Sequence, residues 1–98
     1  MNNGNYVKIK IYMPQISNFF GIIIRMFYDE HNPPHFHAQY GEYDCCVDIH
    51  TLGVIEGFLP ARALGLVVEW AILHKEELIN NWHRIEQQNP LEKIAPLQ

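Results

Sequence analysis

Residues 30–50 read Glu30-His31-Asn32-Pro33-Pro34-His35-Phe36-His37-Ala38-Gln39-Tyr40-Gly41-Glu42-Tyr43-Asp44-Cys45-Cys46-Val47-Asp48-Ile49-His50. The pair Gly41-Glu42 lies between two runs of β-favouring residues, and a glycine at the first position of a two-residue turn suits a type II′ turn. Pro33 and Pro34 cannot occupy central ladder positions in a sheet, because proline has no N–H to donate. This run therefore predicts a loop that leads into a β-hairpin.

The two-residue turn fixes the register of this hairpin. It pairs Tyr40 with Tyr43, Gln39 with Asp44, Ala38 with Cys45, His37 with Cys46, Phe36 with Val47 and His35 with Asp48. Because side chains alternate across a strand, one face is mostly apolar and carries Phe36, Ala38, Tyr40, Tyr43, Cys45, Val47 and Ile49. The other face is polar and carries His35, His37, Gln39, Asp44, Cys46, Asp48 and His50. Two of the polar pairs occupy non-hydrogen-bonded positions, where side chains lie closest, so four proton- or metal-binding groups project together.

Further strands and one long helix flank the hairpin. Alternation predicts strands at Tyr6–Tyr12 and Phe19–Tyr28, with Arg25 on the histidine side, and a short strand at Val54–Glu56. Apolar residues at helical spacing predict one helix from about Pro60 to Gln88, which ends before Pro90. We therefore expect an α+β fold, in which an antiparallel sheet of four to five strands has one face covered by one long C-terminal helix.

The first half of this helix is apolar on a second side, where Leu66, Trp70 and Leu73 follow one another at helical spacing. A helix that is apolar on two sides is either buried all round or covered by another subunit. We expect a homodimer contact through these three residues.

Length and composition limit the class of protein. The chain has 98 residues, 48% hydrophobic and 18% charged, which is typical of one folded domain. We divide it into an N-terminal extension strand, residues 1–12, and a single domain, residues 13–98. The formal net charge of −4 excludes a global basic field for nucleic acid, and no apolar run is long enough to span a membrane. The start lacks signal-peptide features, and the adjacent Cys45 and Cys46 are a poor disulfide pair, so we expect a reduced, cytoplasmic protein.

Several motifs resemble those of a known family: Met13-Pro14-x-Ile16-Ser17-x-Phe19-Phe20-Gly21-Ile22, Arg25-Met26-Phe27-Tyr28, Glu30 to Ala38, Tyr40 to Tyr43, Asp48-Ile49, Gly57-x-Leu59-Pro60-x-Arg62-Ala63, Glu69-Trp70, His74-x-x-Glu77-Leu78 and Asn81-Trp82. From Met13 to Leu97 the chain resembles the small prokaryotic family catalogued as domain of unknown function 4160. Cys46 is not part of the pattern. The resemblance implies no agreed activity, but it implies a partner, because members are often encoded beside another small domain. We therefore expect a component of a two-protein, toxin–antitoxin-like module that acts through protein binding and, as a further option, RNA binding.

The polar face supports two other hypotheses. The first is metal-independent, ribonuclease-type cleavage of RNA. His35, polarised by Asp48, would be the base, His37 or His31 the acid, and Arg25 would stabilise the charge that develops on the phosphate.

The second hypothesis is a transition-metal site, with zinc as the first choice. His35 and His37 alternate along one strand, and Asp48 together with Cys46 or His31 would complete a ligand set of suitable type. The interaction-module interpretation, in contrast, needs no cofactor.

Overall fold

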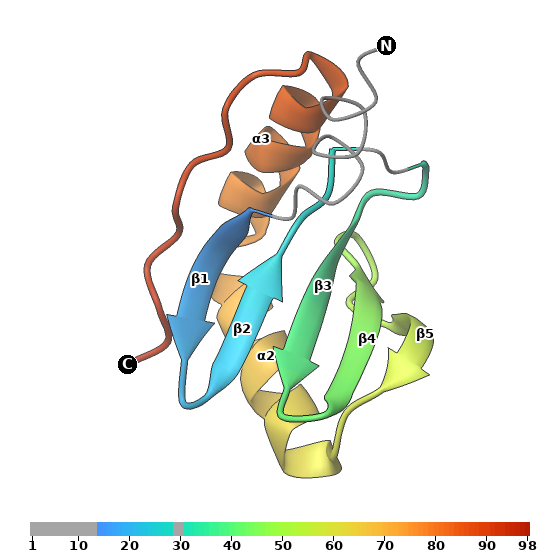
Figure 1. The fold of residues 1–98 in the computed structure, drawn as a ribbon, viewed down its shortest axis with the longest axis vertical. Helices are drawn as coiled ribbons and strands as arrows, with labels where there is room; N and C mark the ends of the chain where they lie inside the picture. Colours follow the sequence, from blue (N-terminus) through green and yellow to red (C-terminus); the bar gives the residue numbers. More distant parts are fainter. Residues whose placement is uncertain (1–13, 29–30) are drawn as a thin grey trace, which may run out of the picture.

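The computed structural model describes residues 14–28 and 31–98. Within these ranges the chain forms one five-stranded antiparallel sheet, and two helices pack on one of its faces (Figure 1). The elements are β1 (Gln15–Phe19), β2 (Ile22–Arg25), β3 (His35–Tyr40), β4 (Tyr43–Asp48), β5 (Val54–Phe58), α2 (Ala61–Leu73) and α3 (Lys75–Glu86). The α+β class and the antiparallel sheet are as predicted. The predicted strand Tyr6–Tyr12 and the proposed extension, residues 1–12, lie outside the described residues.

The β3–β4 hairpin has the predicted register from His35–Asp48 to Tyr40–Tyr43. Gly41 has φ +60°, as the first position of a type II′ turn requires. The face that was predicted to be apolar is buried except near the turn, and Phe36, Ala38 and Val47 are fully buried. The hairpin prediction is confirmed because both of its signals, the turn glycine and the alternation, are local in the sequence.

The prediction of a single strand over Phe19–Tyr28 is wrong. Phe20 and Gly21 both adopt left-handed conformations, with φ +51° and +80°, and they turn the chain between β1 and β2. A two-residue turn with both residues left-handed is the type I′ turn, which usually signals itself by Asn-Gly. Phenylalanine masks that signal here, and its side chain is 60% exposed. The prediction for Arg25 holds, since it lies opposite His37 in the β2–β3 register.

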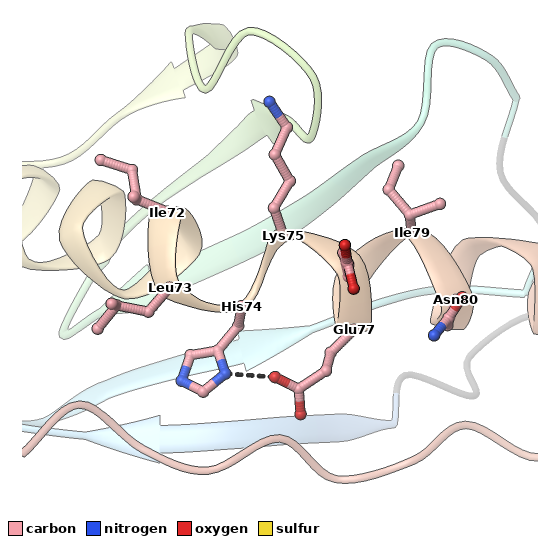
Figure 2. A pocket seen from close by; sticks show the side chains of 8 residues that line it. Ile72, Leu73, His74, Lys75, Glu77, Ile79 and Asn80 are labelled. Atoms are coloured by element: carbon pink, nitrogen blue, oxygen red, sulfur yellow. Dashed lines mark hydrogen bonds and ion pairs between the residues drawn. The ribbon is translucent and has the colours of Figure 1, made fainter.

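The prediction of one continuous helix from Pro60 to Gln88 is also wrong. The helix breaks at His74, whose φ of −122° and ψ of 26° are not helical, so that α2 ends at Leu73 and α3 begins at Lys75. The imidazole of His74 bonds the carboxylate of Glu77 three residues later, which links the residue at the break to the first turn of α3. Lys75 points the other way, and its Nζ donates to the carbonyl of His50, 2.7 Å away (Figure 2).

The C-terminal segment (residues 89–98) lies along the outer edge of β1 (Figure 1). The amide of Ile94 donates to the carbonyl of Ile16 at 2.8 Å. The buried amide side chain of Asn81 forms two bonds with the backbone of Glu92, each 2.9 Å long. This edge of the sheet is therefore covered by the chain itself.

Trp70 belongs to the core. Its side chain is fully buried, and its Nε1 donates to the carbonyl of Ala95 at 2.8 Å. A fully buried Trp70 offers no surface to a second subunit. The predicted homodimer contact stays a prediction for Leu73, which is 66% exposed, and for the half-buried Leu66. Among the described residues, no helix is long and apolar enough to cross a membrane.

Candidate functional site

The face of the sheet opposite the helices carries the predicted histidine cluster. The strand registers align Arg25, His37, Cys46 and Glu56 in one row across β2, β3, β4 and β5. His35 lies two residues before His37 on β3, at the end of the strand. There its ring lies 5.3 Å from that of His37 and 5.3 Å from that of Trp82 on α3. The histidines and Cys46 thus lie on two adjacent strands, β3 and β4, and the ring of Trp82 lies beside that of His35.

Three metal-ligating side chains come together on this face. Ligand atoms of His35, His37 and Cys46 all lie within 4.8 Å of one another, and the three residues are half-buried. The Sγ atom of Cys46 is 3.3 Å from Nδ1 of His37. Nitrogen and sulfur ligands bind zinc at about 2.0–2.1 Å and about 2.3 Å, so tetrahedral ligands are separated by roughly 3.3–3.8 Å. The distance between Cys46 and His37 is therefore in the range that a zinc ion requires, and the ligand atom of His35 lies within 4.8 Å of both.

Both imidazoles are held by neighbours. Nδ1 of His35 is 2.7 Å from the carbonyl oxygen of Pro33. Because a carbonyl can only accept, this contact makes Nδ1 the donor and leaves the lone pair of the neutral ring on Nε2. Metal-binding histidines are usually oriented in this way by a backbone carbonyl or a carboxylate. The ring of His37 stacks on Phe27 with centroids 4.1 Å apart and planes 6° from parallel.

Asp48 is placed opposite His35, as the predicted register requires, but its carboxylate closes the β4–β5 turn. Its Oδ1 accepts the backbone N–H groups of His50 and Thr51 at 2.7 and 2.9 Å. The bond from Thr51, followed by that from His50, holds the pKa of Asp48 below its usual value. Asp48 is not in the cluster of ligand atoms. Its predicted roles, in polarising His35 or in binding metal, stay predictions.

Two other predicted residues occupy different positions. His31 is exposed in the loop before β3 and is not in the cluster. Arg25 lines a hollow of about 360 Å³ together with Phe27, His37 and Asp44. The hollow adjoins the cluster through His37, so Arg25 lies beside the site.

Glu56 was not among the predicted site residues, and the register places it directly opposite Cys46. A regular ladder that continued from the Val47–Val54 pair would set Ile55 opposite Cys46. A bulge makes Ile55 an extra residue, so that Glu56 takes its place. The bulge cannot be predicted from the sequence of β5 alone, because it depends on how β5 pairs with β4.

A larger hollow lies elsewhere, at the junction of α2 and α3, and has a volume of about 730 Å³. Figure 2 shows Ile72, Lys75 and Ile79 on one side of this junction and His74 with Glu77 on the other. His74 and Glu77 bond each other and Lys75 bonds the backbone of His50, so we place the chemistry at the histidine cluster instead.

Comparison with known proteins gives one match. The family model described as "Domain of unknown function (DUF4160)" matches residues 21–83. The matched range runs from the β1–β2 turn into α3 and includes all three residues of the cluster. No curated protein and no solved structure matches the chain.

Proposed function

The chain belongs to the family described as Domain of unknown function (DUF4160), and we propose that it binds a divalent transition metal, zinc first, through His35, His37 and Cys46. The observation that carries this proposal is the convergence of two imidazoles and a thiol within 4.8 Å on adjacent strands. Rigid strands hold such a constellation more accurately than loops do.

The donor set favours zinc over the hard cations. Imidazole and thiolate are borderline to soft ligands, whereas magnesium and calcium prefer oxygen. The bond between His35 and the carbonyl of Pro33 supports the same assignment, because it selects the ring tautomer that can bind metal through Nε2. Zinc would also favour the thiolate form of Cys46, so that binding releases a proton.

A competition titration with a chromophoric chelator tests the proposal. We expect one equivalent of zinc per chain. His37→Ala and Cys46→Ala should each weaken binding by about a hundredfold or more, since each removes one of three ligands. His83→Ala is the matched control, because His83 is exposed on α3 and is not in the cluster. Thermal melts of all variants establish that they fold. A wild-type chain that binds no stoichiometric zinc, or cluster variants that bind as tightly as the control, would refute the proposal.

A second candidate function is that of a component of a two-protein module. The observation in its favour is the exposure of β5, the last strand of the sheet, where Val54, Ile55 and Phe58 are 42%, 47% and 62% exposed. An apolar edge strand is a template for pairing with another chain. Antiparallel pairing of β5 with β5 of a second copy would place the two Glu56 carboxylates opposite each other, and like charges in that position are destabilising. We therefore propose an extended segment of the small protein encoded beside this one as the occupant.

Co-purification of the two proteins tests this second candidate. Ile55→Lys should abolish the complex, since a lysine on an edge strand opposes pairing. Ile72→Lys is the control, because Ile72 is 62% exposed on α2. Absence of a complex, or equal behaviour of the two variants, would count against it. A role in RNA binding or cleavage stays an expectation from the sequence.

A further inference from the structure

We infer that Glu56 supplies the fourth ligand of the metal site, an inference that rests on the proposed binding of metal by His35, His37 and Cys46. The first support is the register. Glu56 lies directly opposite Cys46 in the β4–β5 ladder, and directly paired residues of antiparallel strands project from the same face. Their Cβ atoms are typically about 4.5–5.5 Å apart, which a glutamate side chain can span.

The second support is the way the backbone places Glu56 on this face. The bulge at Ile55 turns Glu56 toward the side of the sheet that carries His37. The next residue, Gly57, has φ +86° and approaches β4 so closely that a Cβ atom there would lie 2.4 Å from the carbonyl oxygen of Asp44. Only glycine allows this close approach of β5 to β4 next to Glu56.

The third support is the chemistry of the ligand set. Zinc in proteins almost always takes four ligands, and three are provided by His35, His37 and Cys46. Asp48, a carboxylate on the same face, already accepts two backbone N–H groups through Oδ1. One thiolate and one carboxylate would together balance the two positive charges of the ion.

Closure of the site requires the side chain of Glu56 to move. Its carboxylate is not among the ligand atoms that lie within 4.8 Å of one another, so the side chain must turn toward the cluster. The residue is exposed, which leaves room for this rotation. Glu56 would then move toward ligands that are already close together.

Cobalt and zinc titrations of the wild type, Glu56→Gln and Glu42→Gln test the inference. Glu42→Gln is the matched control, since it removes the same charge from an exposed position in the β3–β4 turn. We expect Glu56→Gln to weaken zinc binding by about ten- to a hundredfold, and the control to leave it unchanged. If glutamate fills the fourth position, the visible spectrum of the cobalt-loaded wild type should not change near neutral pH. In Glu56→Gln a metal-bound water should replace the carboxylate and titrate near pH 7.

The outcomes separate the two proposals. Equal affinities and equal pH profiles for the wild type and Glu56→Gln would overturn the inference and leave the three-ligand site intact. A wild type and a control that both fail to bind zinc or cobalt would overturn the metal site itself, and the role of Glu56 with it. Circular dichroism shows whether Glu56→Gln is folded, which is expected because the residue is exposed.

Discussion

Replacing Asn81 with alanine tests how the C-terminal segment is held against the sheet. The side chain is 1% exposed, its Nδ2 donates to the carbonyl of Glu92, and its Oδ1 accepts the amide of the same residue. A hydrogen bond contributes about 0.5–1.5 kcal/mol net, and a buried polar group left without a partner costs about 1–3 kcal/mol. Because Asn81→Ala removes two bonds and orphans two backbone groups, we expect it to lower the free energy of unfolding by roughly 2–4 kcal/mol.

Urea unfolding at pH 7 measures this loss, with Asn80→Ala as the control. Asn80 is the neighbouring residue on α3 and is exposed, so its replacement should change stability by no more than about 0.5 kcal/mol. Hydrogen exchange should also quicken at the amide of Ile94, which donates to Ile16. A loss in Asn81→Ala of less than about 1 kcal/mol, or equal to that of the control, would refute the reasoning.

Three other predictions concern the hairpin and the site. Gly57→Ala should destabilise the fold far more than Gly41→Ala, because a Cβ at position 57 meets backbone atoms whereas a Cβ at position 41 meets open space. Equal unfolding midpoints of the two variants would contradict this prediction. Alkylation should modify Cys46 before Cys45, because burial, and then the charge of Asp44, raises the pKa of the Cys45 thiol. Zinc should slow the reaction at Cys46 only, and mass spectrometry of the peptides measures both effects. Asp48→Asn should lower the free energy of unfolding by about 1 kcal/mol at pH 7 and by less in acid. A carboxylate with a lowered pKa stabilises the fold above its unfolded pKa and loses this effect as the pH falls through its folded pKa. A stability difference between Asp48→Asn and the wild type that is the same at pH 7 and pH 3 would argue against the turn bonds.

The β3–β4 hairpin could be predicted in full from the sequence, and with it all three residues of the histidine cluster. Gly41 marks the turn, and the alternation on either side of it separates His35, His37 and Cys46 from the core face. Both signals depend on neighbours in the sequence. A shift of one residue would have moved every apolar side chain of the hairpin to the polar face, so the register was strongly determined.

The parts that could not be predicted depend on contacts between elements. The bulge at Ile55, which places Glu56 beside Cys46, arises where β5 packs on β4. The β1–β2 turn was missed because Phe20 adopts a left-handed conformation that phenylalanine rarely takes. The break at His74 was missed because no side chain caps the start of α3, and neither proline nor glycine lies beside the break.

X-ray absorption at the zinc K-edge of the loaded wild-type chain tests the central claim most directly. The account predicts one zinc per chain, with imidazole scattering and one sulfur at about 2.3 Å, and a total of four ligands. Cys46→Ala should lose the sulfur shell. A spectrum with no sulfur neighbour, or with six oxygen or nitrogen neighbours and no imidazole scattering, would contradict the assignment of His35, His37 and Cys46 as the metal site.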